Sequence, residues 1–122
     1  MDALLYVASA LTGLWGVAHL LATRGVVSGF GELSADNRRI ITMEWIVEGV
    51  VLVSLAALVL AVTAVDATAA SSSAAYAVAI VALLVLAGVS LFTGFRVRFL
   101  PFRLCPFIFA LSAALIALGA WL

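Results

Sequence analysis

Two carboxylates and one imidazole offer most of the chemistry in this sequence. Glu44 and Glu48 stand four residues apart in a largely apolar segment, and His19 is the only histidine. Residues four apart lie on one face of an α-helix, so both carboxylates project the same way. Because two like charges at this spacing repel each other, we expect a shared proton, a bound cation or an arginine partner. Glu48, the deeper of the two in the apolar segment, is the stronger candidate for binding a proton or a ligand.

These three residues are also candidate metal ligands. If His19 faced Glu44 and Glu48, the three side chains would make a site suited to iron, manganese or zinc. The pattern lacks the Glu-x-x-His motif of di-iron bundles, so it indicates no particular cofactor. A structural role is the alternative. In that case Glu44 and Glu48 pair with Arg96 or Arg98 across the molecule, and a carbonyl or carboxylate group satisfies His19.

The segments that hold these residues are apolar enough to require lipid around them. Of the 122 residues, 67% are hydrophobic and only 10% are charged, whereas soluble domains carry about a quarter charged residues. A soluble domain of this length could not bury so much apolar surface. Four apolar segments, about 3–22, 40–65, 74–95 and 105–122, are long enough to cross a bilayer as helices. We therefore predict one domain, an all-α integral membrane four-helix bundle with up-down-up-down topology.

Two residues predict where helices begin. Ser34 is a good N-cap, and Asp36 favours the start of a helix, so the second helix should begin well before its apolar stretch. Pro106 fits the first turn of the fourth helix, where the missing N–H of proline costs nothing.

All positive charge lies in or beside two of the three connections. The six basic residues are Arg24, Arg38, Arg39, Arg96, Arg98 and Arg103. With four spans, the first and third connections lie on the same side of the membrane. The positive-inside rule then predicts that these connections are cytoplasmic and that both termini lie outside the cell (plasma) membrane.

The charge pattern also bears on partners. The net charge is zero, which gives no basic excess for nucleic acid. Arg96, Arg98 and Arg103 alternate with aromatic residues, so they are candidate contacts for anionic lipid headgroups or for an anionic substrate. Their alternative role is to fix the orientation in the bilayer.

Three functions stay open on this reasoning. The first is a small transporter or channel in which Glu48, Glu44 and His19 bind a proton or a cation near the cytoplasmic side. Since four helices enclose little volume, we expect such a protein to form a homo-oligomer. The second is a non-enzymatic accessory or scaffold subunit. The third is a membrane enzyme acting on a lipophilic substrate, with His19 and Glu48 as acid and base. The third function requires a lipid-accessible pocket that reaches both residues.

Overall fold

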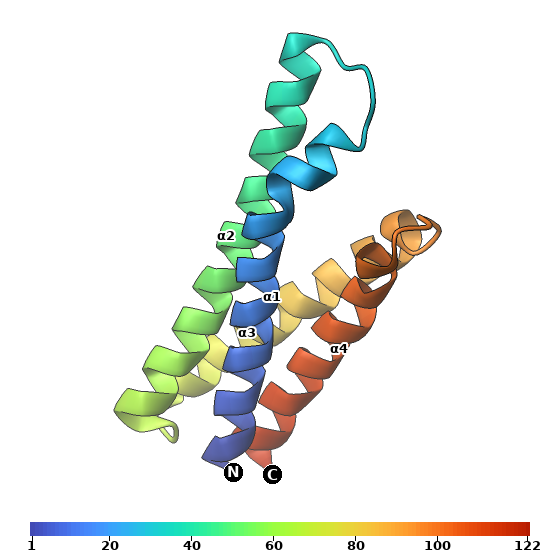
Figure 1. Ribbon diagram of the computed structural model, residues 1–122. Helices are drawn as coiled ribbons and strands as arrows, with labels where there is room; N and C mark the ends of the chain where they lie inside the picture. Colours follow the sequence, from blue (N-terminus) through green and yellow to red (C-terminus); the bar gives the residue numbers. More distant parts are fainter.

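A computed structural model describes residues 1–122, and every element in it is helical. The chain forms α1 (Asp2–Ser28), α2 (Ala35–Asp66), α3 (Ala70–Val89), a π-helical turn η1 (Ser90–Gly94) and α4 (Leu100–Trp121) (Figure 1). The four long helices are each long and apolar enough to cross a membrane. These observations confirm the predicted four-helix bundle and are consistent with a multi-pass membrane protein.

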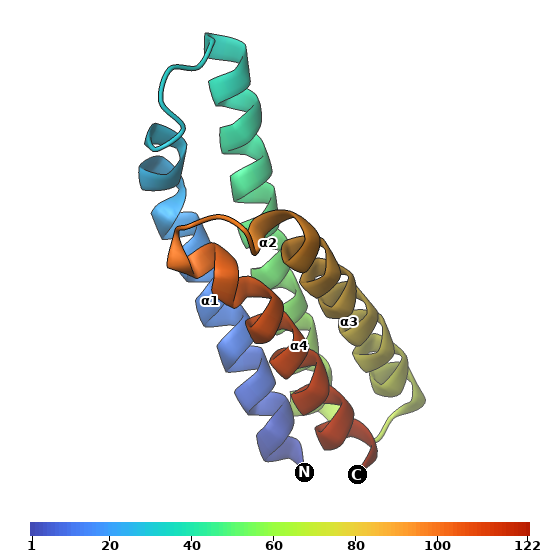
Figure 2. The same cartoon turned by 90° about the vertical axis from the view of Figure 1, so that its right-hand side faces the viewer.

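The helices form a closed ring around one core. Helix α1 packs against α2 and α4, and α3 packs against α4 and, less extensively, against α2. The largest fully buried side chains come from all four helices: Leu5, Leu52, Val59, Tyr76, Leu83, Phe109 and Ile116. Both termini lie at the same end of the bundle as the α2–α3 connection (Figures 1 and 2). The α1–α2 and η1–α4 connections, which carry or adjoin all six arginines, lie at the opposite end, here called the arginine-rich end.

At the arginine-rich end the α1–α2 hairpin extends beyond the α3–α4 hairpin (Figures 1 and 2). Helix α1 runs to Ser28 rather than ending near residue 22. Two side chains support this extension: Thr23 Oγ1 donates to the His19 carbonyl at 3.3 Å, and Ser28 Oγ donates to the Gly25 carbonyl at 2.9 Å. Val27 is also buried, at 5% exposure. The longer helix leaves only a short connection before α2.

The starts of α2 and α4 test the two predicted helix beginnings. Ser34 caps α2, because its Oγ accepts a hydrogen bond from the Asn37 N–H at 3.1 Å. The prediction for Pro106 is wrong. Helix α4 begins at Leu100, so Pro101 occupies its first turn and Pro106 lies inside it. A proline inside a helix removes one backbone hydrogen bond, and this loss is tolerated in membrane helices when neighbouring groups compensate.

Two glycines set the close approach of α1 and α2. A Cβ atom on Gly16 would lie 2.9 Å from Leu52 Cβ, and one on Gly49 would lie 2.6 Å from Leu20 Cδ2. Small residues let helix backbones approach closely in membrane proteins. Gly16 is three residues before His19 and Gly49 directly follows Glu48, so this contact brings the imidazole and the carboxylate face to face.

Candidate functional site

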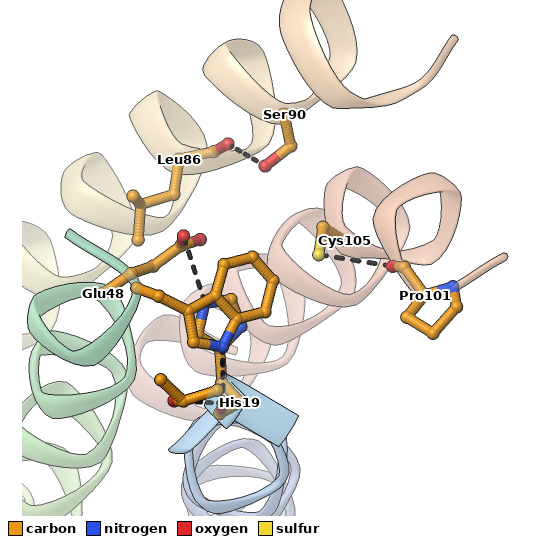
Figure 3. A network of polar contacts seen from close by, with 8 residues as sticks. His19, Glu48, Leu86, Ser90, Pro101 and Cys105 are labelled. Carbon is orange, nitrogen blue, oxygen red and sulfur yellow. Dashed lines mark hydrogen bonds and ion pairs between the residues drawn. The ribbon is translucent and has the colours of Figure 1, made fainter. Parts of the chain in front are cut away.

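His19 and Glu48 meet between α1 and α2, on the arginine-rich side of the core. The Nε2 atom of His19 lies 3.3 Å from Glu48 Oε2, with both residues labelled in Figure 3. The His19 side chain is only 6% exposed, whereas that of Glu48 is 33% exposed. Although the two atoms are within ion-pair distance, Nε2 makes no hydrogen bond. Distance alone does not satisfy a buried nitrogen, because a hydrogen bond also requires the right direction. His19 therefore has an unused polar atom facing Glu48.

Trp45 holds His19 in this position. Its indole ring stacks on the imidazole with ring centroids 3.8 Å apart and an angle of 12° between the planes. Its Nε1–H also donates to the His19 carbonyl at 2.7 Å. The far side of the indole approaches Phe102, whose ring centroid is 5.3 Å away. Two contacts from one α2 residue thus fix both the ring and the backbone of His19.

A cavity of about 250 Å³ opens beside the pair. This site cavity is lined by His19, Trp45, Glu48, Val89, Ser90, Thr93, Gly94, Val97, Phe102 and Cys105. The residues of η1 form one wall. The Phe95 N–H donates to the Ser90 carbonyl at 2.9 Å, five residues back, and this wide turn marks a π-helix, a geometry frequent at functional sites.

The polar groups in this wall and in α4 bond to nearby backbone, as Figure 3 shows for Ser90 and Cys105. Ser90 Oγ donates to the Leu86 carbonyl at 2.7 Å, and Thr93 Oγ1 donates to the Val89 carbonyl at 2.6 Å. Cys105 Sγ donates to the Pro101 carbonyl at 3.3 Å. Each of these groups keeps lone pairs that can still accept a hydrogen bond.

A second hollow, the α2–α3 groove, adjoins the site cavity. It has a volume of about 420 Å³ and is lined by Ile41, Glu44, Trp45, Val47, Glu48, Val51, Leu86, Val89 and Ser90. Glu48 and Ser90 belong to both hollows, and Glu44 lines only the groove. The groove lies where α3 diverges from α2 towards the arginine-rich end (Figure 1). The predicted shared face of Glu44 and Glu48 therefore opens onto one groove, with the exposed Glu44 nearer the α2 N-terminus.

The other sequence-derived pairings do not form. No group of three or more His, Cys, Asp or Glu side chains is arranged to hold a metal ion, so the structure does not assemble His19, Glu44 and Glu48 into the expected three-ligand site. The contacts within ion-pair distance are Arg39–Asp36 and His19–Glu48, the latter an ion pair only when the imidazole holds a proton, so neither glutamate pairs with Arg96 or Arg98. The guanidinium of Arg103 instead lies 5.4 Å from the centroid of the Phe95 ring.

Further buried polar atoms in the bundle lack hydrogen-bond partners. Besides His19 Nε2, these atoms are Trp15 Nε1, Thr12 Oγ1, Ser9 Oγ and Ser112 Oγ. Ser9, Thr12 and His19 recur at helical spacing on α1, so they follow one buried face from the core towards the cavity. A buried polar group without a partner costs about 1–3 kcal/mol.

Sequence reasoning missed Trp45 and η1. Trp45 directly follows Glu44, and an aromatic residue with a polar N–H next to an intramembrane carboxylate was an available signal. Gly16 and Gly49 were also available as markers of close helix approach. The π-helical turn has no comparable signature in the sequence.

Comparison of the chain with protein-family models, with curated proteins and with solved structures found no match.

Proposed function

We propose that this protein is a proton-coupled membrane transporter whose substrate binds in the site cavity beside His19 and Glu48. The observation that supports it best is the buried, unpartnered Nε2 of His19, which faces a carboxylate across 3.3 Å inside a membrane-spanning bundle. Ionisable residues in this position are costly, and they commonly mark substrate or proton pathways. A proton on this pair changes its net charge, and with it the affinity of the cavity for a charged substrate.

A carrier fits the fold better than an open channel. The site cavity lies towards the arginine-rich end, while a packed core fills the bundle between the cavity and the termini. The internal void beside Ser9 and Thr12 is too small for a water molecule. A substrate therefore needs a change of conformation, in one copy or in an oligomer, to reach the other side. The positive-inside rule assigns the cavity side to the cytoplasm.

The buried polar face of α1 gives protons a route in the same account. Thr12 and Ser9 lead from His19 towards the end of the bundle that holds the termini. Hydroxyl groups can both donate and accept hydrogen bonds, so they can pass protons when water enters between them. A conformation that opens this face would satisfy the atoms that lack partners.

The accessory-subunit alternative draws less support from the site. It relied on Glu44 or Glu48 pairing with arginines across the bundle, and the glutamates have no such partners. A membrane enzyme is the second candidate, because the cavity reaches both His19 and Glu48 and adjoins a groove between two lipid-facing helices. An enzyme would return its substrate chemically altered, whereas a transporter delivers it unchanged.

Proton movement in proteoliposomes tests the proposal. Vesicles containing a pH-sensitive dye and an imposed pH gradient are given one of three naphthalene solutes: naphthylmethyl-trimethylammonium, naphthalenesulfonate or naphthylmethanol. We expect at least one solute to accelerate proton movement over protein-free vesicles and to accumulate unchanged.

Glu48→Gln should abolish this coupling, because it removes the carboxylate that faces His19. Glu32→Gln, in the exposed α1–α2 connection, is the matched control and should retain it. Equal rates in wild type and in Glu48→Gln with all three solutes would contradict the proposal.

A further inference from the structure

We infer that the site cavity and the α2–α3 groove select a lipophilic organic cation, a molecule with an apolar aromatic or alkyl body and an ammonium-type head. The inference rests on the proposed function only for transport, since binding can be measured by itself. Four features support it: the hydrogen-bonding character of the cavity, the charges around it, the apolar surface beside it, and the unpartnered imidazole of His19.

The cavity wall offers acceptors and almost no free donors. Ser90, Thr93 and Cys105 each direct their hydrogen to a backbone carbonyl, and the Trp45 N–H is bound to the His19 carbonyl. These side chains therefore present only lone pairs to a ligand. The carboxylate of Glu48 adds two acceptor oxygens. A ligand with an anionic head would meet lone pairs that repel it, whereas a cationic head would be attracted to these lone pairs and to the Glu48 carboxylate.

Charge selects in the same direction. No arginine lines the site cavity or the α2–α3 groove, although all six lie at this end of the molecule. The groove carries Glu44 and Glu48, four residues apart on α2. Two carboxylates in sequence along a hollow that borders lipid attract cations and repel anions. Glu44, which is exposed, is then the first contact of an entering cation, and Glu48 is the final one.

The unpartnered His19 Nε2 distinguishes this arrangement from an ordinary acidic surface. Its side chain is 6% exposed, and its buried Nε2 lies 3.3 Å from Glu48 Oε2. When the imidazole carries a proton, it neutralises Glu48 internally. When the imidazole is neutral, the charge of Glu48 is uncompensated and available to a cation.

Apolar surface for the body of the ligand lies next to the site cavity. A hollow of about 440 Å³ is lined by Gly25, Val26, Gly29, Phe30, Val97, Phe99 and Phe102. Val97 and Phe102 line this hollow as well as the site cavity. The volume of the site cavity falls just below the roughly 300–1,000 Å³ typical of small-molecule pockets. The head of a small amphiphile can therefore lie in the site cavity while its body lies in this adjoining apolar hollow. Trp45 and Phe102 supply aromatic rings that can contact a cation through their faces.

Proton and substrate then compete for one negative charge. Binding of the cation displaces the proton from His19 to water, and the ammonium head takes its place beside Glu48. The other titratable groups near this pair are Glu44 on the same helix and Cys105 from α4, and neither α3 nor η1 contributes a charged side chain to the cavity. Cation and proton thus exchange without a change in the total charge of the site.

Equilibrium dialysis of the detergent-solubilised full chain against the three naphthalene solutes tests this inference. All three share the same aromatic body, so differences report on the head group. We expect naphthylmethyl-trimethylammonium to bind at least about tenfold more tightly than naphthalenesulfonate. Glu48→Gln should weaken the binding of the cation by a similar factor, Glu44→Gln should weaken it less, and Asp36→Asn, at the exposed start of α2, should leave it unchanged.

The outcomes separate the inference from the proposed function. Tighter binding of the sulfonate, or equal binding of all three solutes, would overturn the cation inference even if proton-coupled transport of another solute is observed. Glu48-dependent binding of the cation without proton-coupled transport would support the inference and reject the transporter. If Glu48→Gln fails to fold, the Glu48→Asp variant takes its place. It keeps the negative charge on a shorter side chain, and it must still bind the cation more tightly than the sulfonate.

Discussion

At the scale of single residues, the site depends on how Trp45 and Glu48 surround His19. The histidine could have been satisfied by a nearby carbonyl, as lone buried histidines often are. Instead its ring is held by the stacked indole of Trp45, while Nε2 keeps no hydrogen-bond partner and faces the carboxylate. The orientation that leaves this nitrogen free is therefore maintained by the protein, and it is available to a proton or a ligand.

Trp45→Phe tests that support. Phenylalanine keeps an aromatic ring against the imidazole but loses the N–H that donates to the His19 carbonyl at 2.7 Å. We expect a loss of about 1 kcal/mol in the free energy of unfolding, together with weaker binding of the naphthyl cation. Thermal unfolding in detergent measures the first effect and equilibrium dialysis the second. Trp121→Phe is the control, because Trp121 lies exposed at the end of α4. Equal effects of the two substitutions would refute the positioning role of Trp45.

At the scale of helices, the close contact of α1 and α2 brings the pair together. Gly16 and Gly49 leave room for neighbouring side chains that a methyl group would displace. The contact lies directly beside His19 and Glu48 in the sequence. A small separation of the two helices would therefore lengthen the 3.3 Å distance between His19 Nε2 and Glu48 Oε2 before it disturbed the distant core.

Gly16→Ala should separate this pair. The added Cβ would lie 2.9 Å from Leu52 Cβ and 3.0 Å from the Val53 backbone nitrogen, and neither atom can move without shifting α2. Overpacking of this kind typically costs about 1–3 kcal/mol. We expect lower thermal stability and reduced binding of the cation.

Gly88→Ala provides the comparison, since a Cβ there meets no atom within 4 Å. Alanine is the better helix former, so this control should be neutral or slightly stabilising. A Gly16→Ala variant as stable as Gly88→Ala would show that α1 and α2 are not held in close contact.

The helices also define what could be predicted from the sequence. The lengths of the apolar segments were sufficient to predict the four helices. The spacing of Glu44 and Glu48 was sufficient to place them on one helix face, and this face opens onto the α2–α3 groove. Whether His19 faces them depends on the rotation of α1 against α2, which arises from side-chain packing between segments distant in the sequence. The start of α4 was misjudged because a proline at either position 101 or position 106 suits a first helical turn, and the sequence alone does not choose between them.

At the scale of the whole molecule, charge and shape are arranged asymmetrically. The arginines, the site cavity and the extended α1–α2 hairpin lie towards one end, and both termini lie at the other (Figures 1 and 2). A cavity that opens towards one end of the bundle, beside a closed core, is the form that the proposed carrier requires in one of its two states. The positive-inside rule predicts that the arginine-rich end is cytoplasmic, and on that prediction the proposed carrier faces inward in this state.

Cysteine labelling tests this orientation. In a Cys105→Ala background, which removes the single native cysteine, Glu32→Cys marks the α1–α2 connection and Thr68→Cys marks the α2–α3 connection. A membrane-impermeant maleimide added to intact cells should label the cysteine introduced at position 68 and spare the one at position 32, until the membrane is permeabilised. The reverse pattern would place the site cavity on the outer side, and equal labelling of both would indicate a mixed orientation.

Proton release on binding is the most direct test of the central claim that one proton and one substrate share the charge of Glu48. The detergent-solubilised protein in weakly buffered solution is mixed with naphthylmethyl-trimethylammonium, and the released protons are counted over a series of pH values. Because linkage is reciprocal, we predict close to one proton per bound cation at the pH where the pair is protonated, and none in Glu48→Gln. Binding of the cation without release of a proton at any pH would contradict the account.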